Sequence, residues 1–127
     1  MRMDHIALYV RDLEGARAFF TKYFGGASNQ GYHNPKTTFR SNFLRFEDGS
    51  RLELMTRENL AAGNPGVNCC GYAHLAFGVG STQAVDSLTS QLKEDGYAVI
   101  SGPCTTGDGY YESCVAGFEG NLIEITV

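Results

Sequence analysis

The sequence predicts an α+β fold in which a strand, a helix and three further strands occur twice. Two observations carry this prediction. A histidine stands inside an apolar, alternating stretch at residues 2–10 (RMDHIALYV) and again at residues 71–79 (GYAHLAFGV). An amphipathic helical pattern follows each of these stretches. Because the chain has 127 residues, we expect one domain, residues 1–127, whose two modules share its length.

The first module is expected over residues 1–60. Apolar residues alternate over Met3–Val10, as in a half-buried strand. Asp12 is a suitable N-cap for a helix that Gly25-Gly26 ends. Two β-like stretches follow, and Asp48-Gly49 between them is a hairpin signal. We therefore expect strands over 38–46 and 51–56.

The second module is expected over residues 71–127, after a connecting loop at 61–70. Alternation resumes over Tyr72–Val79, and Ser81 and Gly96 bracket a second amphipathic helix. Its predicted buried stripe consists of Ala84, Val85, Leu88 and Leu92. The remaining strands are expected around 98–100, 110–116 and 122–127. Equivalent positions differ by 69 to 71 residues, so the module repeats.

Composition excludes several classes of protein. The net charge is −4, with 43% hydrophobic and 19% charged residues, which is typical of a packed globular protein. No basic cluster offers a site for nucleic acid. No apolar run approaches the about 20 residues that cross a bilayer, and Asp4 and His5 interrupt the N-terminal stretch where a signal peptide is apolar. We expect a cytoplasmic protein that binds neither membrane nor nucleic acid, with reduced cysteines.

Four polar residues stand between apolar neighbours in the predicted strands: His5, Glu53, His74 and Glu124. Each module supplies one histidine from its first strand and one glutamate from its last. We expect all four in mid-strand, on the sheet face that the helices do not cover. An unpaired carboxylate buried there is costly, and a divalent cation would compensate it. Two imidazoles and two carboxylates suit Ni, Zn, Mn, Fe or Co.

Each of these residues also has a structural interpretation. A single histidine on a strand is commonly a hydrogen-bonded structural residue, and a single glutamate commonly lies on the solvated face of a sheet. The coincidence of four such residues at matching shifts favours metal binding. His33 lies in a turn-rich segment and is assigned no role.

Three motifs resemble the vicinal oxygen chelate superfamily, which includes glyoxalase I, bleomycin-resistance proteins and dioxygenases. They are DHIALYVRDLEGARAFFTKYFG at the start, GYAHLAFGV in the middle and GFEGNLIEITV at the end. The resemblance implies paired βαβββ modules whose curled mixed sheets surround a metal-lined cleft. It also implies a homodimer, because members commonly build the cleft between two chains.

The order His5, Glu53, His74, Glu124 is most similar to that of bacterial glyoxalase I. This implies a metal-dependent lyase of the lactoylglutathione lyase type, which moves a proton through a metal-stabilised enediolate. Glu124, and Glu53 opposite it, are implied as the catalytic bases. Glutathione or another thiol is the implied co-substrate.

Other interpretations stay open at this stage. Tyr9, Tyr72 and Arg57 are candidate substrate contacts, but the tyrosines also fit a hydrophobic wall and the arginine an exposed strand end. The chain could be another metalloenzyme of this superfamily, such as an epimerase, a dioxygenase or a thiol transferase. It could also be a non-catalytic protein that binds or sequesters a small molecule.

Overall fold

The computed structural model describes residues 3–61, 63 and 70–127. The chain forms two compact units, Met1–Ala62 and Gly63–Val127. Most of the predicted connecting loop at 61–70, including Cys69, lies outside the described residues. Among the described residues, no helix is long and apolar enough to span a membrane.

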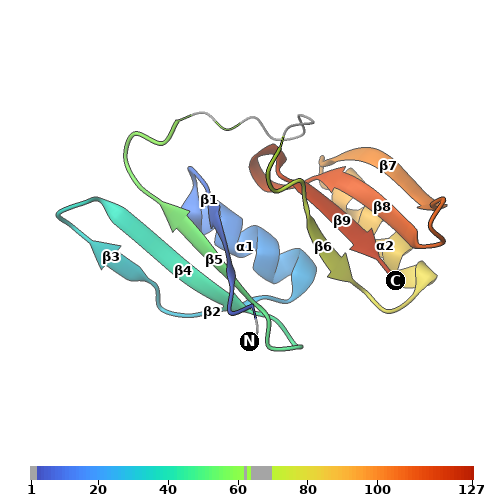
Figure 1. The fold of residues 1–127 in the computed structure, drawn as a ribbon, viewed down its shortest axis with the longest axis horizontal. Helices are drawn as coiled ribbons and strands as arrows, with labels where there is room; N and C mark the ends of the chain where they lie inside the picture. The colour runs from blue at the N-terminus through green and yellow to red at the C-terminus, as the bar shows by residue number, and fades with distance from the viewer. Residues whose placement is uncertain (1–2, 62, 64–69) are drawn as a thin grey trace. The chain divides into compact units, whose positions relative to one another are not determined.

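The first unit is a mixed sheet with one helix (Figure 1). Its strands run in the order β1-β5-β4-β2, with β3 also beside β4. β1 is parallel to β5, and β4 is antiparallel to its neighbours. The elements are β1 (Ile6–Tyr9), α1 (Leu13–Phe24), β2 (Ala27–Ser28), β3 (Tyr32–Asn34), β4 (Phe39–Arg45) and β5 (Arg51–Thr56).

The second unit repeats this plan. Its sheet has the order β6-β9-β8-β7, with β6 parallel to β9 and the other pairs antiparallel. The elements are β6 (Leu75–Gly78), α2 (Thr82–Glu94), β7 (Ala98–Thr105), β8 (Tyr111–Ala116), a 3-10 turn (Phe118–Gly120) and β9 (Leu122–Thr126). The predicted α+β fold with two mixed sheets is therefore confirmed, and both sheets are open rather than closed barrels.

The signals predicted for both helix ends are present. The Asp12 side chain accepts a hydrogen bond from the Gly15 N–H at 2.9 Å, and Ser81 caps α2 through Ala84 N–H at 3.2 Å. Gly25 ends α1 in the left-handed conformation (φ 67°). Gly96 follows the end of α2 with φ 94°. The predicted boundary residues thus stand at the observed ends of both helices.

Each helix buries one face against its own sheet. In the first unit, Leu13, Ala16, Phe19 and Phe20 of α1 are buried, and the sheet contributes Leu44, Leu52 and Leu54. In the second, Val85, Thr89 and Leu92 of α2 are buried together with Val115, Ile123 and Ile125. The predicted stripe of α2 is thus partly correct: Ala84 and Leu88 are half-buried, and Thr89 is buried instead.

Thr89 is buried because its hydroxyl is satisfied within the unit. Its Oγ1 donates to the Val85 carbonyl oxygen at 2.6 Å and lies 2.6 Å from Ser113 Oγ on β8. A buried hydroxyl with such partners avoids the cost of desolvation.

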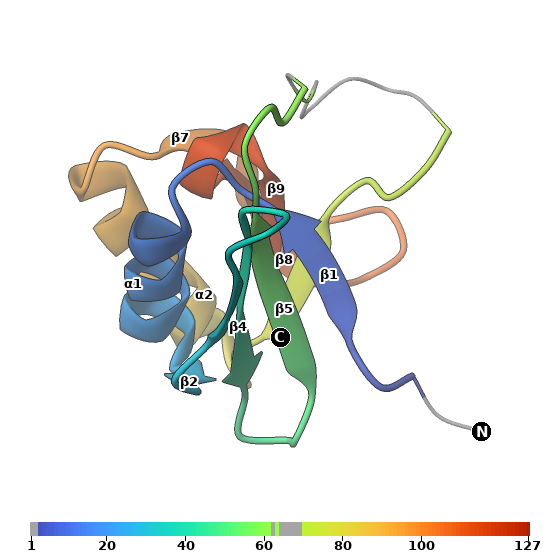
Figure 2. The ribbon, with the colours of Figure 1, turned by 90° about the vertical axis from the view of Figure 1, so that its left-hand side faces the viewer.

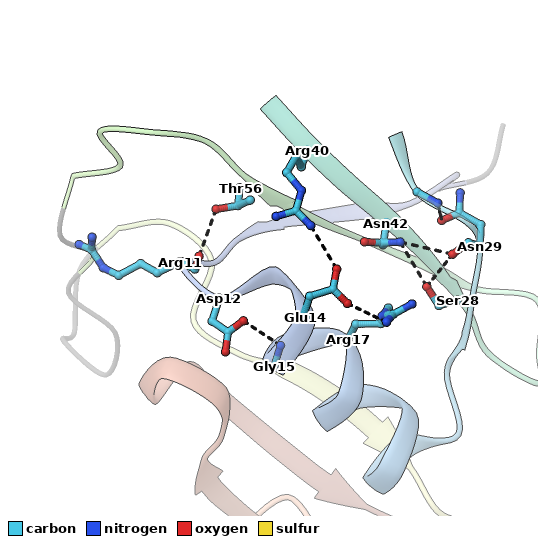
Figure 3. A network of polar contacts seen from close by, with 11 residues as sticks. Arg11, Asp12, Glu14, Gly15, Arg17, Ser28, Asn29, Arg40, Asn42 and Thr56 are labelled. Atoms are coloured by element: carbon cyan, nitrogen blue, oxygen red, sulfur yellow. Dashed lines mark hydrogen bonds and ion pairs between the residues drawn. The ribbon is translucent and has the colours of Figure 1, made fainter. Parts of the chain in front are cut away.

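Polar contacts tie α1 to its sheet (Figure 3). Glu14 accepts from Arg40 of β4 at 3.2 Å and pairs with Arg17 at 2.7 Å on its own helix. The buried Asn42 donates to Ser28 Oγ and to the Asn29 carbonyl oxygen. These polar residues stabilise the arrangement of α1, β2 and β4.

The structure differs from the predicted strands in three places. β2 and β3 form in a segment without alternation, where β3 includes His33. β7 runs on to Thr105, past Gly102 and Pro103, because register shifts within the β7–β8 ladder accommodate them. β1 and β6 are shorter than predicted and begin at Ile6 and Leu75.

Candidate metal centre

The two glutamates occupy equivalent places in the two sheets. Glu53 lies in β5 between the buried Leu52 and Leu54, so its own side chain faces away from α1. Glu124 lies in β9 between buried isoleucines and faces away from α2 in the same way. Figure 2 shows α1 on one face of the first sheet. The mid-strand position predicted for the glutamates is correct.

The two histidines, by contrast, are not in mid-strand. His5 and His74 each stand directly before the first residue of β1 and β6. The prediction of a mid-strand position was wrong because the parallel ladder begins one residue later, with Ile6 paired to Leu52 and Leu75 to Ile123. At a strand end both imidazoles are partly exposed.

Each unit brings its histidine and glutamate together. His5 Nε2 lies 3.6 Å from Glu53 Oε2, and His74 Nε2 lies 3.5 Å from Glu124 Oε2. The backbone register explains this match, because the residue two positions after each histidine is paired with the glutamate, Ala7 with Glu53 and Ala76 with Glu124. The same pair is thus formed twice by the same topology.

The surroundings of His5 are polar on one side and aromatic on the other. Its Nδ1 lies 2.9 Å from Asp4 Oδ2, and Arg51 is hydrogen-bonded to the same carboxylate. The hydrogen bonds from His5 and Arg51 hold the pKa of the Asp4 carboxyl below its usual range. The ring of Phe43 meets that of His5 edge-on, with centroids 5.1 Å apart.

The surroundings of Glu124 are acidic. Glu112 and Cys114 lie on β8, and Cys114 is the direct register partner of Glu124. Burial, the charge of Glu124 and a hydrogen bond between the two side chains raise the pKa of the Glu112 carboxyl. Burial, followed by the charges of Glu124 and Glu112, raises the pKa of the Cys114 thiol. The thiol therefore stays neutral at physiological pH.

Three of the four cysteines lie among the described residues. Cys70, Cys104 and Cys114 are free. Of the three, Cys114 is half-buried and the other two are exposed.

The predicted substrate contacts lie at or near strand ends. Tyr9 lies in β1, two positions beyond Ala7, and is 46% exposed. Tyr72 precedes β6 and is fully exposed, so it makes no packing contact with the His74–Glu124 pair. Arg57 follows the end of β5 and is exposed. Tyr9 and Arg57 belong to the first unit and Tyr72 to the second.

The spacing within each pair fits two ligands of one cation. Two ligand atoms that each lie about 2.1 Å from a zinc ion are about 3.0–3.4 Å apart. The measured 3.5 and 3.6 Å are close to this value and longer than a good hydrogen bond. Over residues 3–61, 63 and 70–127, no three His, Cys, Asp or Glu side chains are grouped to hold a metal. Each unit thus brings one imidazole and one carboxylate to about the spacing of two ligands of one cation.

One protein-family model matches nearly the whole chain. A family model of the Glyoxalase/Bleomycin resistance protein/Dioxygenase superfamily matches residues 2–125. The chain belongs to this superfamily. A curated relative, the uncharacterized protein YqjT of Bacillus subtilis (strain 168), is 32% identical over 117 residues. These residues cover 86% of this chain and 85% of YqjT. The resemblance seen in the sequence motifs is thus confirmed.

Solved structures of the superfamily share the fold. A glyoxalase family protein from Bacillus cereus matches with a TM-score of 0.84 at 22% identity, covering 99% of this chain and 93% of its own. The fosfomycin resistance protein FosX of Listeria monocytogenes, solved with Mn(II) and sulfate, matches with a TM-score of 0.73 at 20% identity, covering 99% and 91%. Superfamily members with this fold thus include a protein that binds a divalent metal.

Sequence reasoning found the two pairs and missed their neighbours. Asp4, Arg51 and Phe43 surround His5, and Glu112 and Cys114 adjoin Glu124. A signal for Glu112 and Cys114 existed, since alternation over 110–116 places both on the face of β8 opposite the buried Ser113 and Val115. Only the tertiary structure identifies the neighbours of His5 as one group.

Proposed function

We propose that this chain is a metal-dependent lyase of the glyoxalase I type. The observation that carries the proposal is the duplicated pair, with imidazole and carboxylate 3.6 Å apart in one unit and 3.5 Å apart in the other. The order of the four residues, His, Glu, His, Glu, resembles that of bacterial glyoxalase I.

The four residues would together bind one divalent ion, Ni, Zn, Mn, Fe or Co, because each pair supplies two of the four protein ligands. The two pairs would come from one chain or from two copies in a homodimer. When bound, the metal supplies a Lewis acid that polarises a substrate carbonyl and stabilises negative charge on its oxygen.

The chain's own residues would carry the proton. Glu124, and Glu53 on the other side of the substrate, would take a proton from one carbon and return it to the adjacent carbon, which is the work of a general base and then a general acid. Both carboxylates are partly exposed, 23% and 16% respectively, so they are accessible to a small molecule.

We further propose which residues contact the substrate, which thiol takes part and where in the cell the protein acts. Tyr9, Tyr72 and Arg57 would contact the substrate, and the arginine suits a carboxylate of it. Glutathione or another thiol would be the co-substrate. The reduced cysteines fit a protein that acts in the cytoplasm.

Metal content is the first test. We expect about one divalent metal ion per chain by inductively coupled plasma mass spectrometry, in wild type and in the control His33→Ala. The variants His74→Ala and Glu124→Ala should lose it. His33 is a matched control, because it is exposed in β3 and is not part of either pair.

Activity is the second test. The metal-loaded protein should isomerise the hemithioacetal of methylglyoxal and glutathione, and Glu124→Gln should lower kcat at least about 100-fold, as for loss of a general base. Metal binding without this activity would leave the metal site and refute the glyoxalase assignment. A wild type that stays metal-free after incubation with Ni, Zn, Mn and Fe would refute both.

A further inference from the structure

His5 is partly exposed and belongs to a ring of contacting side chains with Asp4, Arg51 and Phe43, which we call the His5 cage. Asp4 Oδ2 lies 2.9 Å from His5 Nδ1. Arg51 is hydrogen-bonded to the same carboxylate oxygen and also lies over the Phe43 ring, with Cζ 4.8 Å from its centroid. Phe43 in turn packs edge-on against His5. Each member of the cage thus contacts two others.

The cage constrains both the orientation and the protonation of the imidazole. An ionised carboxylate only accepts hydrogen bonds, so the nitrogen facing Asp4 must carry the proton. In the neutral ring the other nitrogen, Nε2, then has a free lone pair. This nitrogen is the one that lies 3.6 Å from Glu53. The cage therefore presents an unprotonated nitrogen beside the second predicted ligand.

The second unit provides an internal comparison. The strand register identifies the equivalents of the cage residues, because Phe43 is paired with Glu53 as Cys114 is paired with Glu124. By the same register Leu122 takes the place of Arg51, and Ala73 precedes His74 as Asp4 precedes His5. None of the three equivalents, Cys114, Leu122 and Ala73, has a carboxylate that could accept a hydrogen bond from the imidazole of His74. The His–Glu pair is present in both units and the cage in one.

We propose that Asp4, held by Arg51, is a positioning residue that keeps His5 in its Nδ1–H form with Nε2 directed towards Glu53, ready for a divalent cation. The half-site of the first unit is preorganised, whereas His74 takes its metal-binding tautomer and orientation when the cation binds. The inference rests on the proposed function for the role of the cation. Its structural half, the fixed tautomer of His5, stands without metal.

The first readout is the tautomer in metal-free protein. Nitrogen-15 NMR of histidine-labelled, chelator-treated protein at pH 8 distinguishes a protonated ring nitrogen from a bare one. We expect one tautomer for His5 and a mixture for His74. Asp4→Ala should convert His5 to a mixture and leave His74 unchanged. A circular dichroism spectrum equal to that of wild type shows that the variant is still folded.

The second readout is metal affinity. Loss of a carboxylate that orients a ligating histidine weakens metal binding by about 10- to 100-fold. We expect this loss of Zn(II) affinity, measured by competition with a chromophoric chelator, for Asp4→Ala, and a smaller loss for Arg51→Gln. The control Glu47→Ala removes an exposed carboxylate of the same unit, from the turn after β4, and should bind Zn(II) as wild type does.

The outcomes separate this inference from the proposed function. A wild type that binds Zn(II), with an Asp4→Ala variant of equal affinity and unchanged His5 tautomer, would overturn the positioning role alone. A mixed His5 tautomer in the wild type would overturn it as well. Failure of the wild type to bind any metal refutes the proposed function, and the tautomer measurement still decides whether Asp4 positions His5.

Discussion

Glu53 and Glu124 are equivalent residues with different neighbours. The register partner of Glu53 is the aromatic Phe43, whereas that of Glu124 is Cys114. Two positions before these partners stand Ser41 in the first unit and Glu112 in the second. The carboxylate of Glu112 therefore adds negative charge beside Glu124 that Glu53 does not have from the equivalent position. This difference makes the surroundings of Glu124 more acidic than those of Glu53.

Glu112 gives a prediction for the pH dependence of stability. Its pKa is raised in the folded protein, first by burial and then by Glu124. Between the ordinary pKa of a glutamate and this raised value, the folded chain binds more protons than the unfolded chain, so stability falls as pH rises. The glutamine of the Glu112→Gln variant does not ionise, so this variant does not lose folding stability in that pH range. We expect metal-free Glu112→Gln to be more stable than wild type at pH 7, by less than about 1 kcal/mol because solvent screens the partly exposed group.

Urea denaturation of both proteins at pH 4 and pH 7 measures this effect. At pH 4 the two free energies of unfolding should be nearly equal, since the wild-type carboxyl is mostly protonated in both states. Glu47→Gln serves as the exposed control and should show no pH-dependent gain. A gain for Glu112→Gln that is larger at pH 4 than at pH 7 would contradict the proposed cause.

At the scale of elements, β7 depends on Gly102. This glycine has φ +73°, and a Cβ on it would lie 2.4 Å from the Glu112 carbonyl oxygen and 2.9 Å from Ser113 Cα. Both are backbone atoms of β8, so the strand itself would have to move. We expect Gly102→Ala to destabilise the protein by about 2 kcal/mol or more, from the left-handed backbone and the overlap together.

Gly107→Ala is the matched control. No atom lies within 4 Å of a Cβ placed there, and its φ is outside the region that favours glycine. Thermal and urea unfolding should show a change below about 0.5 kcal/mol for this variant. Equal effects at the two positions would show that the close approach of β7 to β8 does not determine stability here.

The elements that could be predicted from sequence are those whose signals are local. Asp12 and Ser81 cap helices, and Asp48-Gly49 joins two strands, because each acts on residues next to it in the chain. β7 could not be predicted past Gly102, since a glycine and a proline normally end a strand and only the ladder with β8 continues it. β2 and β3 form for the same kind of reason, through pairing with β4.

The candidate site follows the same division. The repeat and the alternation of apolar residues identified Glu53 and Glu124, whose places depend on strand periodicity. The His5 cage could not be found this way, because Asp4 and Arg51 are 47 positions apart in sequence and meet through the parallel pairing of β1 and β5. A contact of that range depends on topology, which periodicity does not report.

The whole molecule consists of two units of one topology, each with its own helix, sheet and core. Each unit supplies one imidazole and one carboxylate, which is half of the four-ligand site that we propose. If one cation takes ligands from both units, it links their two cores. Metal binding should then be visible in the stability of the whole chain.

We expect the metal to raise the free energy of unfolding. A ligand that binds the folded state alone adds about 2.7 kcal/mol at 100 times its Kd. Calorimetry with and without Zn(II) should therefore show a higher Tm for wild type and for His33→Ala, and EDTA should reverse the increase. His5→Ala and His74→Ala should each abolish most of it, although they lie in different units. A stabilisation that survives either histidine variant would mean that one half-site binds the cation without the other, and the four-ligand site would be wrong.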